Sequence, residues 1–266
     1  MSTPKALILR APGINCERET HHAFERAGAS SEYVHIKKLL EKPELLDRFQ
    51  ILSVPGGFSY GDDISSGRVL AQEMKARLGE RMLNWIDRGG TAFGICNGFQ
   101  VLVRLGLLPC GNDRLEEEVT LTHNLSNHYE CRWVTLQTRK SRCVFLPEGL
   151  TLRWPAAHGE GRLMAKDTRA LQTLLDEGFA AVQYVDDAGQ PTEQYPQNPN
   201  GAPLGIAGLT NHNGRVLGVM PHPDRSYLPT HMPNWRRTQL EHGALPEDGD
   251  GMVVFREMVR AARAEG

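Results

Sequence analysis

The stretch Thr91-Ala-Phe-Gly-Ile-Cys96-Asn-Gly-Phe-Gln100 carries most of the information about the fold. An apolar run, typical of a buried strand, passes directly into a turn, and helical periodicity begins at once. Gly94 and Gly98 flank the cysteine two residues away on either side, where a Cβ would crowd the neighbouring backbone. The pattern predicts a nucleophile elbow, with Cys96 on a sharp turn between a strand and a helix.

The same segment has the chemistry of a nucleophilic thiol. A helix that begins immediately behind Cys96 directs the positive end of its dipole at the sulfur, which favours the thiolate over the thiol. The backbone N–H of Asn97 is then free to donate to an oxyanion. A buried, unreactive cysteine is the usual alternative, but the position between two glycines at a strand–helix junction favours the nucleophile.

A second apolar strand ends in glycines upstream, in Ile51-Leu-Ser-Val-Pro55-Gly56-Gly57-Phe58-Ser59-Tyr60-Gly61-Asp62. Taken alone, Pro-Gly-Gly predicts only a turn. Because the elbow follows about 40 residues later, we expect the Gly57 N–H to be the second oxyanion donor, opposite Asn97.

A third segment, Val216-Leu-Gly-Val-Met220-Pro221-His222-Pro223-Asp224-Arg225, supplies a base. The strand places His222 at its carboxyl end, where the functional residues of such sheets collect. Asp224 follows two residues later and could hold the tautomer and orientation of the imidazole. A histidine near proline is otherwise an ordinary loop residue, but a cysteine nucleophile needs a base, and His222 is the best-placed candidate.

Around these segments, the first half of the chain alternates strand and helix patterns, which indicates an α/β fold with a mostly parallel sheet and helices on both faces. Predicted strands are Ala6–Arg10, Ser31–Ile36, Gln50–Val54 and Thr91–Ile95, and predicted helices are Glu17–Ala27, Gly67–Leu78, Gly79–Arg88 and Gly98–Leu105. The second half predicts a small antiparallel portion, with strands at Arg132–Thr138, Thr151–Trp154, Ala180–Val185, Leu204–Leu209 and Val216–Met220. We expect one domain over residues 1–266, with a loop-rich excursion at 226–251 and a closing helix at 252–264.

Composition narrows the possible functions. The 30 Lys and Arg against 32 Asp and Glu give a net charge of −2, which disfavours a nucleic-acid-binding surface. No run of about 18 apolar residues predicts a membrane span, and the N-terminus lacks the pattern of a signal peptide. Five cysteines without CxxC spacing indicate reduced thiols in the cytoplasm and no metal site. His123 and His128 have no third ligand nearby in sequence.

In this order, the three segments resemble class I (triad) glutamine amidotransferases. Within this family, further motifs are similar to those of the glutaminase components of phosphoribosylformylglycinamidine synthases. They are Pro12-Gly-Ile-Asn-Cys16, Pro55-Gly-Gly-Phe-Ser-Tyr-Gly-Asp62 and Ala157-His-Gly-Glu-Gly161, and the resemblance spans residues 5 to 225.

The resemblance implies a flavodoxin-like fold and a role for each matching residue. Cys96 would attack the side-chain amide of glutamine, His222 would transfer the proton, Asp224 would orient His222, and the N–H groups of Gly57 and Asn97 would hold the oxyanion. The residues implied in substrate binding are Gln100, Phe58, Ser59, Tyr60, Gly61, Asp62 and His158. No cofactor is implied in this chain. A partner synthetase would bind ATP, Mg²⁺ and formylglycinamide ribonucleotide and receive ammonia, and a small third subunit would bridge the two.

One departure from the family concerns Asp224, because the family usually has Glu there. The side chain is one methylene shorter, so its contact with His222 is expected to be longer, water-bridged or compensated by a backbone shift. The family keeps a cysteine at Cys16, but no base is placed beside it in sequence, so we interpret Cys16 as structural or near the partner. His158 competes with His222 as base, but we interpret it as lining the glutamine pocket or the ammonia exit.

Three alternatives remain open from sequence. The same cysteine–histidine pair serves other amidotransferase pathways, although the Phe58–Asp62 stretch disfavours them. A peptidase or γ-glutamyl hydrolase on a similar sheet would need an open groove for a larger substrate. A regulatory subunit with a degenerate site would not need to retain Cys96, His222 and an acidic residue at 224.

Overall fold

The computed structural model describes residues 3–109 and 115–264. Its strands are β1 (Lys5–Arg10), β2 (Ser30–His35), β3 (Ile51–Val54), β4 (Thr91–Ile95), β5 (Val119–His123), β6 (Glu130–Thr138), β7 (Thr151–His158), β8 (Glu160–Ala165), β9 (Ala180–Tyr184), β10 (Ile206–Thr210) and β11 (Val216–Val219). Its α-helices are α1 (Glu17–Arg26), α2 (Ile36–Glu41), α3 (Arg68–Asp87), α4 (Asn97–Leu105), α5 (Thr168–Asp176), α6 (Trp235–His242) and α7 (Met252–Ala264).

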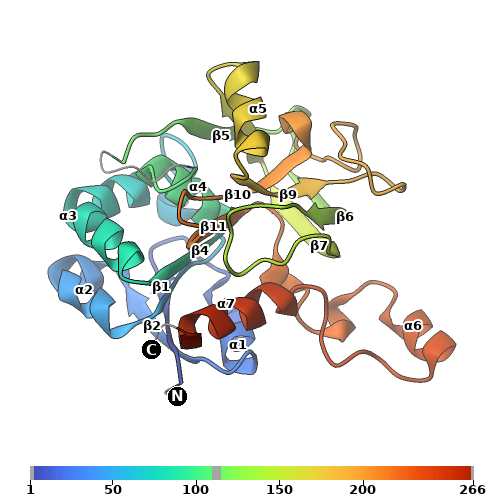
Figure 1. The fold of residues 1–266 in the computed structure, drawn as a ribbon, viewed down its shortest axis with the longest axis horizontal. Coiled ribbons are helices and arrows are strands. Elements are labelled where there is room, and N and C mark those ends of the chain that lie inside the picture. The colour runs from blue at the N-terminus through green and yellow to red at the C-terminus, as the bar shows by residue number, and fades with distance from the viewer. Residues whose placement is uncertain (1–2, 110–114, 265–266) are drawn as a thin grey trace.

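One nine-stranded sheet, in the order β2-β1-β3-β4-β11-β10-β9-β6-β7, organises the molecule. The first five strands in this order pair in parallel, and the remaining pairs are antiparallel. Helices α3 and α4 lie on one side of the parallel part, and α1 and α7 lie on the other (Figure 1). The predicted α/β fold, with a parallel half and antiparallel strands in the second half, is confirmed.

The strand order brings together segments that lie far apart in the sequence. β4 pairs with β3 on one side and with β11 on the other, with Gly94 opposite both Val54 and Gly218. Because parallel strands end at the same edge of a sheet, the turns after β3, β4 and β11 are neighbours. These are the three segments that the sequence marks as functional.

Helix α3 differs from the prediction of two helices divided at Gly79. A glycine is a poor helix former, yet the helix continues through it without a break. A Cβ at Gly79 would lie 2.7 Å from Leu115 Cδ1, so the glycine makes room for a packed leucine. Tertiary packing accounts for this residue, and helix propensity does not.

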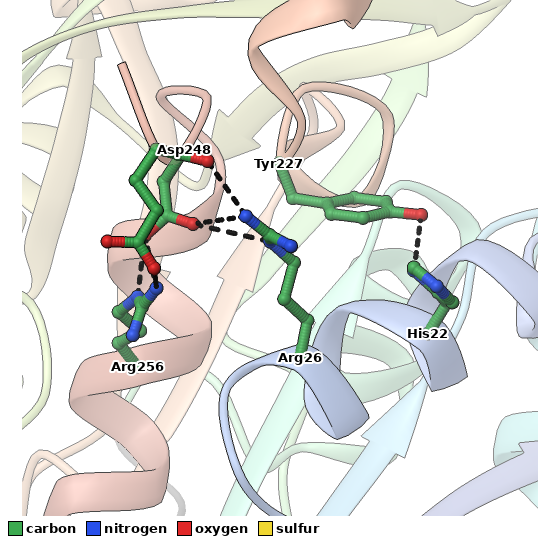
Figure 2. Close-up of polar contacts among 6 residues, drawn as sticks. His22, Arg26, Tyr227, Asp248 and Arg256 are labelled. Carbon is green, nitrogen blue, oxygen red and sulfur yellow. Dashed lines mark hydrogen bonds and ion pairs between the residues drawn. The ribbon is translucent and has the colours of Figure 1, made fainter.

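The excursion at 226–251 contains helix α6, which the sequence analysis did not predict and which projects from the body of the molecule (Figure 1). Polar contacts, shown in Figure 2, fix the C-terminal end of this excursion to helices α1 and α7. Asp248 accepts hydrogen bonds from Arg26 of α1 at 3.2 Å and from Arg256 of α7 at 2.6 Å. Between the same two helices, the Phe255 ring of α7 meets the Phe24 ring of α1 edge-on, with 5.0 Å between ring centroids. No helix in the described part of the chain is long and apolar enough to cross a membrane.

The close contact between α4 and β3 makes Gly98 a sensitive position. A Cβ at Gly98 would lie 1.8 Å from the carbonyl oxygen of Val54. We expect Gly98→Ala to lower the free energy of unfolding by about 3 kcal/mol, because backbone must move to relieve the clash. Denaturant unfolding measures this change. Gly159→Ala is the control, since its Cβ would meet nothing closer than 3.8 Å, and an equal effect from both variants would contradict the packing argument.

Candidate active site

Cys96 lies on the turn that the sequence predicts. It is the N-cap of α4, with φ 52° and ψ −107°, a conformation that costs an ordinary residue on the order of 1–3 kcal/mol. The hydrogen bond from its N–H to the Val219 carbonyl, at 2.7 Å, holds the turn against β11. The thiol is 6% exposed and contacts the carbonyl oxygen of Ala157 at 3.6 Å. The arrangement is that of a nucleophile elbow.

His222 follows β11, the strand beside β4. Its backbone N–H donates to the Pro155 carbonyl at 2.8 Å, and its ring is buried. Nδ1 pairs with Asp224 Oδ1 at 3.1 Å, while Nε2 has no hydrogen-bond partner among the described residues. The ring therefore has one nitrogen fixed by a carboxylate and the other available for chemistry.

The direct contact with Asp224 settles how the shorter acid is accommodated. Asp224 is fully buried, and its second oxygen accepts from the Thr20 hydroxyl of α1 at 3.4 Å. Of the three expected ways to accommodate the shorter acid, the longer and the water-bridged contacts are wrong, and a backbone that brings the carboxylate within direct reach remains. Burial acts to lower the pKa of His222, but the charges of Asp224 and Cys96 act in the opposite direction and raise it well above its usual value. This favours the imidazolium form of His222.

Gly56 shows how closely the two predicted catalytic side chains approach each other. A Cβ built on Gly56 would lie 2.8 Å from His222 Cε1 and 3.5 Å from Cys96 Cβ. Cys96 and His222 thus surround one small space, and a side chain at position 56 would fill it. The two residues that the sequence predicts as nucleophile and base are brought together.

The side chain of Asn97 connects the residues expected to bind substrate. Its Oδ1 accepts from the Ser59 N–H at 3.0 Å, and its Nδ2 donates to Asp62 at 3.1 Å and to Gln100 at 2.9 Å. Gln100 in turn donates to the carbonyl oxygen of Glu160. From sequence, Asn97 was expected to have only a backbone role, because one residue type gives no sign of which loops it will join.

The other residues expected to bind substrate lie in different surroundings. Tyr60, next to Gly61, donates its hydroxyl to Glu73 of α3 at 2.5 Å, and burial together with Glu73 raises the pKa of Tyr60 to about 12. The Phe58 ring is 45% exposed and lies 6.4 Å from the Tyr129 ring. The Phe58 ring is therefore partly open to solvent, while the Tyr60 hydroxyl is engaged by a helix.

His158 is part of the site but is poorly suited to be its base. Its Nδ1 pairs with Asn124 Oδ1 at 3.1 Å, and its Nε2 is buried with no partner among the described residues. Burial, with a smaller effect from the charge of His222, lowers the pKa of His158 to about 3. The neutral ring cannot pick up a proton near pH 7.

The position of Cys16 corrects the sequence interpretation, which placed no base beside it. Its Sγ lies within 4.8 Å of a ring nitrogen of His222 and of a carboxylate oxygen of Asp224. These three residues are the one such group that could hold a metal in the described part of the chain. Because the Asp224 carboxylate is already bonded to His222 Nδ1, the geometry is explained by that pair and a neighbouring thiol. His123 and His128 belong to no such group in the residues described.

The fold and the site define a class of protein. The model of the CobB/CobQ-like glutamine amidotransferase domain matches residues 3–260, and the chain belongs to this family. It is 43% identical over 264 residues to phosphoribosylformylglycinamidine synthase subunit PurQ of Dehalococcoides mccartyi, covering 99% of both chains. Identity to the PurQ subunit of Methanococcus maripaludis is 40% over 256 residues, covering 96% of this chain and 93% of that one.

Solved structures agree with this assignment. A chain in the structure of PurLQS from Thermotoga maritima superposes with a TM-score of 0.71 at 29% identity, covering 97% of this chain and 99% of that one. A separate glutamine amidotransferase from Thermotoga maritima has a TM-score of 0.51 at 14% identity, with 100% of this chain and 94% of that chain covered. The second likeness concerns the fold alone.

The low pKa of buried His158 predicts that the stability of the folded protein depends on pH. In the unfolded chain a histidine titrates near pH 6.5, whereas the pKa of folded His158 is about 3. Between these values the unfolded state binds the extra proton, so stability falls as the pH drops. From pH 6.5 to pH 5 we expect a loss of about 2 kcal/mol from this residue.

The test compares urea unfolding of the wild type and His158→Gln at both pH values. His158→Gln is expected to lose about 2 kcal/mol less than the wild type over this range. Exposed His242 provides the control, since His242→Gln should retain the wild-type slope. Equal pH slopes for the wild type and His158→Gln would show that His158 is protonated in the folded protein.

Proposed function

We propose that this chain is the glutaminase subunit of a phosphoribosylformylglycinamidine synthase, which hydrolyses glutamine to glutamate and ammonia. One observation carries the proposal: Cys96 and the His222–Asp224 pair surround the same small space at the ends of β4 and β11. A thiol on a strained turn, next to an imidazole fixed by a carboxylate, is suited to acyl transfer. Family membership and the 43% identical PurQ relative identify the acyl donor as glutamine.

The reaction proceeds through two half-steps. The Cys96 thiolate adds to the side-chain carbonyl carbon of glutamine, and the N–H groups of Gly57 and Asn97 stabilise the oxyanion. Asn97 lies at the first position of α4, where a helix N–H has no intrahelical acceptor. His222 gives its proton to the departing nitrogen, so ammonia and a γ-glutamyl thioester form. His222 then removes a proton from water, which attacks the thioester and releases glutamate and the thiolate.

We assign glutamine binding to the loop Phe58–Asp62, to Gln100 and to His158. Asn97 supports this assignment, because its side chain holds Ser59, Asp62 and Gln100 in fixed positions around the turn. Binding groups that are already paired within the protein lose little freedom when a ligand arrives. Residues 1–266 are proposed to work as one amidotransferase domain, with 226–251 as an excursion from it.

The relatives indicate the partners. The Thermotoga maritima structure with the higher identity is one of PurLQS, and we infer that this chain assembles with a large synthetase and a small bridging subunit. ATP and Mg²⁺ would bind to the synthetase, with no cofactor or metal in this chain, and formylglycinamide ribonucleotide would receive ammonia there. Ammonia has to arrive unprotonated, because ammonium has no lone pair for attack. A nucleophilic thiol also requires reducing conditions, which supports a cytoplasmic location.

Alternatives from other classes make different predictions. A peptidase or γ-glutamyl hydrolase would accept γ-glutamyl peptides better than free glutamine. Another amidotransferase pathway would use the same site but a different synthetase, which copurification with the synthetase distinguishes. A regulatory subunit would bind its partners without hydrolysing glutamine.

Covalent labelling tests the central assignment. A glutamine-analogue electrophile should modify Cys96 in a one-to-one ratio, and peptide mass spectrometry locates the adduct. Cys96→Ala should remove the label, and excess glutamine should slow it by competition. An adduct on Cys16, or no adduct at all, would remove the nucleophile proposed here.

The carboxylate behind His222 provides a second test. Asp224→Asn should lower the glutaminase kcat by about 10²–10⁴-fold, because the amide stabilises neither the imidazolium nor its required tautomer. Steady-state assays of the chain, alone and with its synthetase, measure the loss. Asp47→Asn is the control, since this carboxylate lies on the surface and pairs with Arg81 and Arg88. A kcat within twofold of wild type for Asp224→Asn would exclude it from the triad.

A further inference from the structure

Cys16 lies in the site without a role in the proposed reaction. It is the N-cap of α1 and is 1% exposed. Its thiol donates to Asn15 Oδ1 at 3.3 Å, and its sulfur accepts from Arg225 Nη2 at 2.9 Å. The sulfur also contacts the space left open by Gly56, 3.1 Å from the position of a Cβ there, on which His222 Cε1 and Cys96 converge.

The surroundings of Cys16 keep the thiol neutral. Burial raises its pKa, and this outweighs the nearby positive groups His222 and Arg225. The S–H is directed to Asn15, so it does not compete with Cys96 for the base. A neutral, polarisable sulfur beside an imidazole packs against the ring and acts as a weak hydrogen-bond acceptor.

Contacts of helix α1 hold Cys16 and the His222 segment in fixed positions. Glu19 pairs with Arg225 at 3.5 Å, and the Thr20 hydroxyl donates to the Cys16 carbonyl at 2.7 Å and lies 3.4 Å from Asp224 Oδ2. Two residues further, His22 bonds to the Tyr227 hydroxyl at 2.9 Å (Figure 2). Successive positions of one helix therefore grip the segment that carries His222 and Asp224.

The imidazole needs this second support. A single hydrogen bond to Asp224 fixes Nδ1, but one bond leaves the ring free to tilt about it. A group packed against the ring limits that tilt and keeps Nε2 directed at the reacting atoms, and small misplacements of a catalytic group cost large factors in rate.

We propose that Cys16 is a positioning residue for His222, whose sulfur, anchored by Arg225 and α1, restricts the imidazole to the orientation that serves Cys96. The inference rests on the proposed glutaminase function. Cys16 touches neither substrate nor the reacting atoms in this role. It acts through the histidine alone.

The test compares Cys16→Ala and Cys16→Ser with a matched buried thiol, Cys143→Ala. Cys143 is buried and interacts with Thr210 and the backbone of Phe145. The next residue, Val144, donates a backbone hydrogen bond to Gly214, which lies just before β11, the strand that His222 follows. Cys16→Ala should lower kcat roughly tenfold with KM for glutamine within twofold, because binding groups are untouched. Cys16→Ser should recover part of the rate, and Cys143→Ala should keep it within twofold.

The pH profile separates positioning from general destabilisation. The Cys16 contact is among those that raise the pKa of His222, so the limb of the kcat/KM profile that reports His222 should move to lower pH in Cys16→Ala. An unchanged profile and kcat, a rise in KM alone, or a loss of rate that follows the melting temperature as in Cys143→Ala would each overturn the proposal.

Electrophile labelling of the same variants tests the glutaminase assignment separately from the positioning role of Cys16. An adduct on Cys96 in every variant supports the glutaminase assignment whatever the rates, and an adduct on Cys16 in the wild type rejects both.

Discussion

The parallel pairing of β4 with β11 is the constraint on which the candidate site depends. Its register sets Ile95 beside Val219, so the chain leaves both strands at the same point on the sheet edge. A slip of one residue would turn every side chain of one strand to the opposite face and would separate Cys96 from His222. The hydrogen bond from the Cys96 N–H to the Val219 carbonyl extends this pairing into the turn itself.

Strain at one point is balanced by packing around it. Cys96 adopts a left-handed φ that few residues tolerate, and the absence of a Cβ at Gly98 lets α4 begin directly against β3. On the far side of the site, α1 contributes Thr20 and Cys16, which bound the His222–Asp224 pair. The candidate site thus lies between the strained turn at Cys96 and helix α1, which contacts the His222–Asp224 pair. Both follow from elements outside the reacting residues.

Sequence reasoning succeeded where local patterns dictate structure. The elbow around Cys96, the strand before His222 and the alternation of strands and helices all have periodicities or glycine spacings with a direct steric cause. It failed where a residue's role depends on a distant neighbour. Gly79 suggested a helix boundary but makes room for Leu115, and the length of Asp224 left three kinds of contact open, of which the turn makes a direct one.

By itself, the sequence determined the fold class, the elbow and the family to which the chain belongs, because these depend on patterns that are each contained in a short segment of the chain. Only the tertiary structure decided that Asn97 joins Ser59, Asp62 and Gln100, that His158 is neutral, and that Cys16 borders His222. Burial and long-range contacts set hydrogen bonding and protonation, and neither can be read from residue type and spacing. The same thiol would be an inert cap in one packing and a support for catalysis in another.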